Sequence, residues 1–183
     1  MAQFSKYEPK LRKWEGEGYY DKPTDAGGPT KDGVTLTTFR MFFGEDKTVD
    51  DLKAMLPSQW KKIMKGGFWD KCCADDITNQ YVAEIFVDWC VNCGIGMVRK
   101  VQALVGTTVD GKVGTKTVAA INSCNQRALH YRIKRARIEY YLSLVERNGR
   151  ELSPRATILP FNIANIDGWI RRTASFIYED GKK

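Results

Sequence analysis

Two carboxylates and a hydroxyl occur within a short glycine-rich segment near the start of the chain. Glu15 ends a predicted helix, Asp25 follows it in a loop, and Thr30 lies 15 residues after the glutamate. The glutamate also has an aromatic neighbour in sequence, Trp14 or Tyr19. Hydrolysis of a glycosidic bond uses such a set: one carboxyl donates a proton, and a second charged group positions water or stabilises the cation-like transition state. An apolar wall raises the pKa of a glutamate and keeps it a proton donor near neutral pH.

The same residues also fit a segment without catalytic chemistry. Residues 16–35 are dense in glycine, proline and aspartate, which favour turns and stop a helix from continuing. Long irregular segments in compact domains are often functional. On these residues alone, the alternative is a solvated loop in which the aspartates only cap helices.

Helices are predicted for most of the remaining chain. Residues 34–38 either start a short strand or cap the helix that follows, and no other segment is a credible strand. The predicted helices span residues 5–15, 49–56, 59–64, 98–105, 115–121, 125–147 and 166–178. A further helix is predicted from residue 76 or 78 to the glycines at 94 and 96. Thr48 and Thr115 are the predicted N-caps. The fold is therefore expected to be mainly α, with at most a small β-hairpin.

Length and composition are those of an ordinary globular protein. The chain has 183 residues, 43% of them hydrophobic and 28% charged, which suits one domain or two small ones. No uncharged apolar stretch reaches the roughly 18 residues of a membrane helix, so we expect no membrane insertion. The first residues lack the apolar core and cleavage site of a secretory signal, which predicts a chain that is cytoplasmic as synthesised.

The cysteines and the single histidine limit the possible chemistry. An odd number of cysteines, five, without a secretory signal predicts reduced thiols, and we expect them to be buried structural residues. Cys90 and Cys93 form a C-x-x-C pair, but no second pair follows at zinc-ribbon spacing. His130 is the only histidine and lies among helix formers, which indicates a packing or surface role. We therefore expect no metal, no cofactor, and no Ser-His or Cys-His catalysis.

The net charge of +7 suits an anionic cell-wall polymer, and it also raises the possibility of nucleic-acid binding. A basic run of Arg132, Lys134, Arg135 and Arg137 lies in the longest predicted helix. No helix-turn-helix or zinc-finger pattern accompanies this run. We therefore interpret it as a solvated helix face and expect no nucleic acid as a partner. The alternative for this run is a basic, helical protein that binds nucleic acid.

The glycine-rich segment resembles the motif of glycoside hydrolase family 108, the N-acetylmuramidases with a lysozyme-like fold. That motif runs Glu-Gly-Gly-Tyr, then Asp-x-Gly-Gly-x-Thr, and two residues later Gly-Val/Ile-Thr. Its three parts correspond here to residues 15–19, 25–30 and 33–35. The first part carries one extra residue, Glu17, so that either Glu15 or Glu17 is the family's acid. We favour Glu15, because it keeps the family's preceding context and ends the helix. Its separation from Thr30 also resembles that in phage lysozymes.

The resemblance continues along the chain. Asp88 and the glycines at 94 and 96 resemble the helix that closes the family's catalytic part. Residues 101–117 resemble the peptidoglycan-binding region usually attached to it, and residues 165–172 resemble its closing Gly-Trp-x-x-Arg element. We therefore expect a lysozyme-like catalytic region at residues 1–97 and a helical peptidoglycan-binding region at residues 98–183, packed together as one compact unit.

The resemblance implies a role for each residue of the motif. Glu15 is the expected general acid, Asp25 stabilises the transition state or helps to hold water, and Thr30 positions that water. Expected substrate-binding residues are Tyr19 on the cleft floor, Gly27, Gly28, and Trp169 as a sugar platform. A core aromatic is the alternative role for Trp169. The sequence does not choose between inversion, with carboxyls about 6.5–9.5 Å apart, and retention, with carboxyls about 5–5.5 Å apart.

The implied function is that of an N-acetylmuramidase, which hydrolyses the MurNAc-GlcNAc β-1,4 linkage in the glycan strands of peptidoglycan. The alternative is a non-catalytic peptidoglycan-binding protein associated with phage lysis or secretion. Both contexts fit an enzyme released to the cell wall by a holin or a secretion apparatus. A monomer is the expectation for a small lysozyme.

Overall fold

The computed structural model describes the backbone of residues 1–21, 28–151 and 161–180. It divides into two compact units, one of Gln3–Asp75 and one of Asp76–Lys183 together with Met1–Ala2. Helices dominate both units, which confirms the mainly α, lysozyme-like fold that the sequence predicts. Among the described residues, no helix is long and apolar enough to cross a membrane.

The unit of Gln3–Asp75 is built around aromatic side chains. Its helices are α1 (Phe4–Glu15), α2 (Leu36–Phe43), α3 (Val49–Lys53), α4 (Pro57–Met64) and the π-helix η1 (Lys65–Trp69). Helix α1 buries Phe4, Tyr7 and Leu11, which recur at helical spacing along one face. The Tyr7 ring stacks on Trp69 with 5.8 Å between the ring centroids. This packing fixes α1, and therefore the position at which α1 ends.

Helix starts in this unit follow local sequence signals. Thr35 accepts a hydrogen bond from the Thr38 N–H and caps α2. Thr48 and Asp51 form a capping box at α3, which confirms the predicted cap at Thr48. Pro57 occupies the first turn of α4, where its missing N–H has no cost. The interruption predicted at Pro57 is therefore a helix start.

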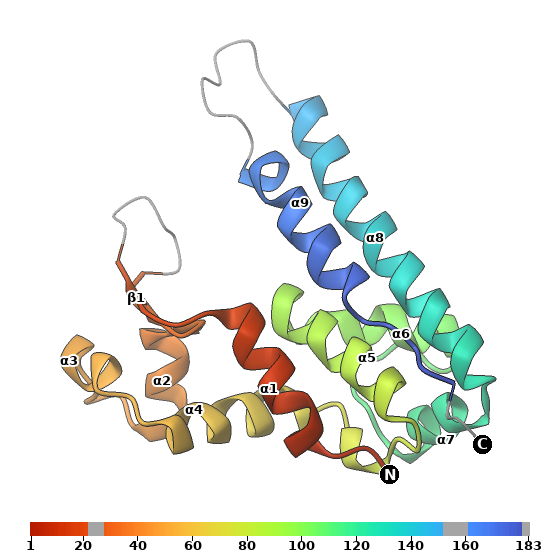
Figure 1. Cartoon of the computed structure of the whole chain (residues 1–183), viewed down its shortest axis with the longest axis horizontal. Helices are drawn as coiled ribbons and strands as arrows, with labels where there is room; N and C mark the ends of the chain where they lie inside the picture. Colours follow the sequence, from red (N-terminus) through yellow and green to blue (C-terminus); the bar gives the residue numbers. More distant parts are fainter. Residues whose placement is uncertain (22–27, 152–160, 181–183) are drawn as a thin grey trace. The chain divides into compact units, whose positions relative to one another are not determined.

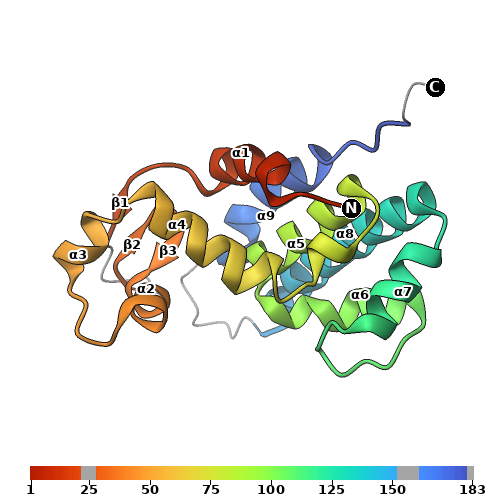
Figure 2. The ribbon, with the colours of Figure 1, turned by 90° about the horizontal axis from the view of Figure 1, so that it is seen from below.

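A small antiparallel sheet lies in the glycine-rich segment, as Figure 2 shows. Its strands are β1 (Tyr19–Tyr20), β2 (Thr30–Lys31) and β3 (Val34–Thr35), in the order β1-β2-β3. Asp32 and Gly33 join β2 to β3 with positive φ angles of 48° and 77°. Two consecutive residues with positive φ form a type I′ turn, which suits two-residue hairpin loops, and Asp-Gly is a preferred sequence for this turn. The hairpin was predicted, whereas β1 adds a third strand.

The second unit surrounds one central helix. It contains η2 (Ala74–Asp76, of which only Asp76 lies in this unit), α5 (Gln80–Cys93), η3 (Ile95–Met97), α6 (Val98–Val105), α7 (Thr115–Ser123), α8 (Gln126–Glu151) and α9 (Phe161–Ala174). Residues 82–90 of α5 are all buried, as expected of a helix packed on every side. The long helices α8 and α9 lie side by side (Figure 1).

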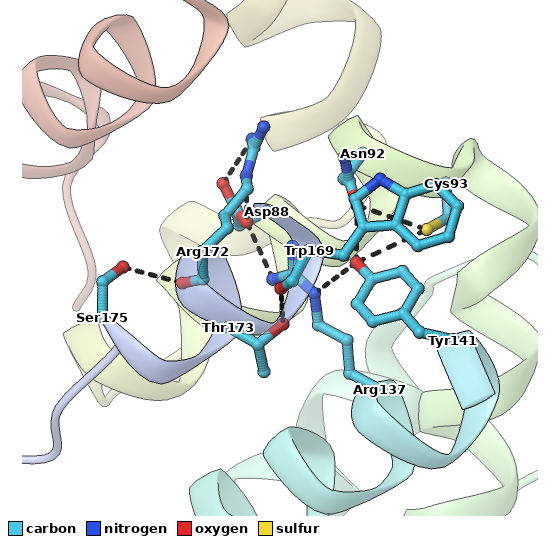
Figure 3. Close-up of polar contacts among 9 residues, drawn as sticks. All are labelled: Asp88, Asn92, Cys93, Arg137, Tyr141, Trp169, Arg172, Thr173 and Ser175. Carbon is cyan, nitrogen blue, oxygen red and sulfur yellow. Dashed lines mark hydrogen bonds and ion pairs between the residues drawn. The ribbon is translucent and has the colours of Figure 1, made fainter. Parts of the chain in front are cut away.

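Three buried charged side chains join α5, α8 and α9 (Figure 3). Arg172 donates from Nε and Nη2 to the two carboxylate oxygens of Asp88, at 2.9 and 2.7 Å. Arg137 places Nη1 at 2.7 Å from Asp88 Oδ2 and donates from Nε to the Tyr141 hydroxyl at 2.8 Å. Asp88 and Arg137 are fully buried. We name these three residues, Asp88, Arg137 and Arg172, the charge triad.

The prediction that the basic run on α8 is a solvated face is wrong in part. The basic run on α8 is not a solvated face throughout, because Arg137 is fully buried and Lys134 is half-buried. The Lys134 ammonium donates to the carbonyl oxygens of Ala174 and Phe176, at 3.0 and 2.9 Å. Arg132 and Arg135 are exposed, as predicted. The run was misjudged because spacing along α8 does not reveal the buried carboxylate on α5.

Several helix boundaries also differ from prediction. Helix α5 begins at Gln80 with Asn79 as its cap, because residues 74–76 form a separate short 3-10 turn. The residue that precedes α7 is Gly114, so Thr115 begins the helix and does not cap it. Helix α8 continues to Glu151, past the predicted stop at Gly149. The last helix begins at Phe161 and ends at Ala174, earlier than predicted at both ends.

The thiols and the histidine are packed as structural residues. Cys72 and Cys90 are buried, and the other three cysteines are half-buried. His130 is fully buried between tyrosine rings, with the Tyr178 centroid 5.5 Å away. Burial and the nearby Lys134 charge lower the pKa of His130 from 6.5 to about 4, so its ring is neutral at physiological pH. The packing role predicted for His130 is confirmed.

Candidate functional site

Glu15 lies at the point where α1 ends against the β2–β3 turn. Gly16, with φ of 75°, turns the chain away from the helix, and its N–H donates to the Arg12 carbonyl at 3.1 Å. The half-buried Glu15 side chain packs over Gly33. A Cβ at Gly33 would lie 3.1 Å from Glu15 Cβ and 3.2 Å from its carboxyl carbon, and it would overlap carboxylate oxygen Oε2. The missing side chain of Gly33 therefore makes the space that Glu15 occupies.

Asp32 holds this turn in place. Its carboxylate accepts a hydrogen bond from the Gly18 N–H at 2.7 Å, and its own N–H donates to the Gly18 carbonyl at 2.9 Å. The indole N–H of Trp60 donates to the Asp32 carbonyl at 2.9 Å. Trp60 is buried in α4, so the turn is anchored to the core of its unit. The position of Glu15 is thus fixed from two sides, by its helix and by this turn.

Thr30 lies on β2, on the face of the sheet that it shares with Tyr20 and Thr35. These residues are opposite one another in the strand register, and directly opposed residues lie on the same face. The Thr30 hydroxyl donates to the Gly28 carbonyl at 3.0 Å. That bond links two of the predicted site residues and orients the hydroxyl. A hydroxyl oxygen has further acceptor capacity, so Thr30 can also hold a water molecule.

Tyr19 lies on the opposite face of the sheet, with Lys31 as its strand partner. Its hydroxyl donates to Asp21 at 3.0 Å, and the Lys53 ammonium is 5.0 Å from the ring centroid. Partial burial and the Asp21 carboxylate raise the pKa of Tyr19, so the phenol stays protonated at neutral pH. Its ring can therefore offer an apolar face and a hydrogen-bonding hydroxyl to a sugar.

A hollow of about 220 Å³ adjoins this segment. Its lining residues are Arg12, Gly16, Glu17, Gly18, Lys31, Asp32, Pro57 and Trp60. The Arg12 guanidinium lies 4.1 Å from the Trp60 ring centroid and also pairs with Glu8 at 3.0 Å. Glu17 lines the hollow and is exposed, whereas Glu15 is half-buried beside it in sequence. The two glutamates thus have different environments, the exposed one facing polar and charged groups.

The predicted site residues are distributed as follows. Glu15, Tyr19, Gly28 and Thr30 all belong to the unit of Gln3–Asp75 and gather around one small sheet. Asp25 and Gly27 lie outside the described residues. Trp169 belongs to the other unit, where its half-buried ring stacks on Tyr141 with 5.0 Å between centroids.

Three residues around the candidate site were not identified from the sequence. Asp32 is one of the turn-forming residues of segment 16–35, but its hydrogen bond with the Gly18 N–H joins residues that are 14 positions apart. In the sequence, Trp60 resembles any other apolar helix residue. Its indole N–H donates to the carbonyl of Asp32, which is 28 residues away. Arg12 carries no motif of its own. The Asp-Gly pair at residues 32 and 33 was the one local signal that could have identified the turn beside Glu15.

No group of three or more histidine, cysteine, aspartate or glutamate side chains that could hold a metal ion occurs in the part of the chain that the structure describes. The site chemistry in these residues is that of carboxylates, hydroxyls and an aromatic ring.

Comparison with known proteins agrees with this chemistry. Residues 9–94 match the family model "Glycosyl hydrolase 108", and residues 97–174 match the model "Predicted Peptidoglycan domain". The solved structure titled "Structure of Brucella abortus SagA" is similar to this chain, with a TM-score of 0.71 and 26% identity over 94% of each chain. A search of the curated proteins gave no match. The two matched regions together span nearly the whole chain, and the hydrolase match in residues 9–94 indicates a glycoside hydrolase acting on peptidoglycan.

Proposed function

We propose that this chain is an N-acetylmuramidase that hydrolyses the MurNAc-GlcNAc β-1,4 linkage, with Glu15 as the general acid. The observation that carries the proposal is the close packing of the Glu15 carboxylate over Gly33, in a turn that is anchored to the core. A side chain at position 33 would occupy the space of that carboxylate. Such a fixed and partly desolvated carboxyl suits proton donation to a leaving oxygen.

The other motif residues complete the mechanism. Glu15 donates its proton to the glycosidic oxygen, and the sugar ring acquires positive charge as the bond breaks. Asp25 stabilises this charge or holds water, and the Thr30 hydroxyl, oriented by the Gly28 carbonyl, positions the water. Tyr19, Gly27 and Gly28 contact the glycan, and Trp169 provides a further sugar platform in the second region.

The proposed functional regions are residues 1–97 for catalysis and residues 98–183 for peptidoglycan binding. The family matches meet close to this boundary. We further propose that the enzyme is a monomer and reaches the cell wall after release by a holin or a secretion apparatus. The net charge of +7 favours its accumulation on an anionic wall.

A non-catalytic wall-binding protein is the competing proposal. It is supported by the extra residue in the motif, because Glu17 lines the hollow and Glu15 does not. In that case the segment binds glycan without cleaving it.

Dye release from labelled peptidoglycan tests these proposals. We expect release by the unaltered chain and a loss of at least about a hundredfold in Glu15→Gln, the usual contribution of a general acid. Glu17→Gln is the matched control, since it makes the same change two residues away on an exposed side chain. Thermal unfolding of all three proteins establishes that each is folded.

The outcomes separate the candidates. Loss confined to Glu17→Gln would move the acid to position 17. Failure of the folded, unaltered chain to release dye from several wall types, with retained binding to the walls, would favour the non-catalytic proposal.

A further inference from the structure

A second cavity, of about 570 Å³, lies in the region that matches the peptidoglycan domain. It is formed by the loop between α6 and α7 and by the start of α7. Its lining residues are Gly106, Thr107, Thr108, Asp110, Lys112, Val113, Gly114, Thr115, Lys116 and Thr117. Ligand pockets commonly have volumes of about 300–1,000 Å³, so this one has room for a short peptide or sugar.

The loop around this cavity is held by one buried amide. Gln102, on α6, donates to Asp110 Oδ1 at 2.8 Å, to the Lys112 carbonyl at 3.0 Å and to the Thr117 hydroxyl at 3.3 Å. Its oxygen accepts from the Gly111 N–H at 2.8 Å. Gln102 is 1% exposed, so the loop is tied to the helix from inside. A cavity held in this way loses little conformational freedom when a ligand binds.

The acidic residue in the cavity lining, Asp110, is already hydrogen-bonded to neighbouring groups of the protein. Asp110 Oδ1 accepts the Gln102 amide and also the Lys112 N–H, each at 2.8 Å. These bonds lower the pKa of the Asp110 carboxyl and hold its charge toward the loop backbone. Asp110 therefore serves the loop as a structural group.

The remaining polar groups are mostly donors. The side chains of Lys112 and Lys116 are exposed, and neither forms an ion pair among the described residues. The Thr107 hydroxyl oxygen is buried without a hydrogen-bond partner in the described part of the chain. Two cations and several hydroxyls around a preformed cavity suit a ligand with carboxylates.

A peptide fits this lining better than a glycan does. No aromatic residue lines the cavity, whereas sugar rings are commonly held against aromatic faces. Threonine hydroxyls and loop backbone groups can pair with the amides of an extended peptide, and the lysines with its carboxylates. We propose that this cavity binds the carboxylate-bearing peptide stem of peptidoglycan, with Lys112 and Lys116 as the residues that recognise its charge.

This site is separate from the motif around Glu15 and does not depend on its proposed role. The glycan would be cleaved by one unit, while the stem peptide is held by a cavity within the other. The inference predicts that the enzyme prefers peptide-substituted glycan to bare glycan.

Amide chemical shifts of the full chain, isotope-labelled and carrying Glu15→Gln to prevent turnover, test the proposal. The probe is a synthetic stem tetrapeptide with free carboxylates. We expect saturable shifts concentrated in residues 106–117, and a roughly tenfold weaker affinity in Lys116→Gln and in Lys112→Gln, the value of one charge-assisted hydrogen bond. Lys100→Gln is the matched control, because Lys100 is exposed on α6 and does not line the cavity.

Three results would overturn the proposal. These are an absence of shifts in residues 106–117, equal affinity for the peptide with all its carboxylates amidated, and unchanged affinity in both lysine variants. A peptide-free chitin oligosaccharide that shifts the same amides would show a glycan subsite instead. Because binding is measured without turnover, this test can succeed even when the dye-release test of Glu15 fails.

Discussion

At the scale of single residues, the Glu15 side chain occupies space that is open because Gly33 has no Cβ atom. Gly33 combines a φ of 77° with a position against the Glu15 side chain, so it meets two requirements at once. Only glycine adopts such a φ routinely, and only glycine leaves room for the carboxylate. The sequence motif includes this glycine, and the contact with Glu15 supplies a physical reason for it.

We predict that Gly33→Ala displaces the Glu15 carboxylate and lowers dye release by at least about tenfold, as expected for a misplaced catalytic group. The backbone strain alone should cost about 1 kcal/mol of unfolding free energy. Gly94→Ala is the matched control, because Gly94 has a similar φ of 86° but no neighbouring atom within 4 Å of a new Cβ. Activity and denaturant unfolding of both variants are the measurements.

Equal activity losses in the two alanine variants would mean that backbone strain, and not the contact with Glu15, causes the effect. Full activity in Gly33→Ala would contradict the proposed role of the turn.

At the scale of elements, the charge triad explains how α5 can bury the carboxylate of Asp88. Asp88 is neutralised by two arginines that come from α8 and α9 (Figure 3). Removing one partner from a buried ion pair is costly, since it leaves charge in a low-dielectric interior. The triad also joins Asp88, near the end of the hydrolase match, to Arg172 in the closing Gly-Trp-x-x-Arg element.

We predict that Asp88→Asn lowers the free energy of unfolding by about 3–5 kcal/mol, because Arg137 and Arg172 lose their shared carboxylate. Asp167→Asn is the matched control, since Asp167 is exposed on α9. Denaturant unfolding measures both variants. A change below about 1 kcal/mol in Asp88→Asn would show that water or another group replaces the carboxylate.

Sequence patterns predict the helices themselves better than the contacts between them. Apolar periodicity and caps located most helices, including the capping box at Thr48, because those signals are local. The burial of Arg137 was missed, because its partner Asp88 lies on another helix. At the candidate site, the motif predicts roles for Glu15 and Thr30, whereas the contacts of Asp32 and Trp60 join residues that are distant in sequence. Such contacts leave no spacing that one sequence reveals.

At the scale of the whole molecule, functional regions and packing units have different boundaries. The family matches meet between residues 94 and 97, but the compact units meet between residues 75 and 76. Helix α5 accounts for the difference. It belongs to the hydrolase match by sequence, and it packs with α8 inside the second unit.

This difference predicts how fragments fold. A fragment of residues 76–183 keeps α5 and its charge triad, so we expect a cooperative thermal transition. A fragment of residues 98–183 lacks Asp88 and the apolar face of α5, so we expect no cooperative transition. Circular dichroism during heating compares the two. A sharp transition in the shorter fragment would show that the peptidoglycan region is independent of α5.

The central claim is that water adds to muramic acid when the glycan is cut. Its most direct test is digestion of purified peptidoglycan in water enriched in the heavy oxygen isotope, followed by immediate reduction and mass spectrometry of the new ends. We predict that the label appears on reduced muramic acid at every new end, and that Glu15→Gln produces no such ends. Label on glucosamine ends, or unlabelled anhydro-muramic ends, would contradict muramidase hydrolysis.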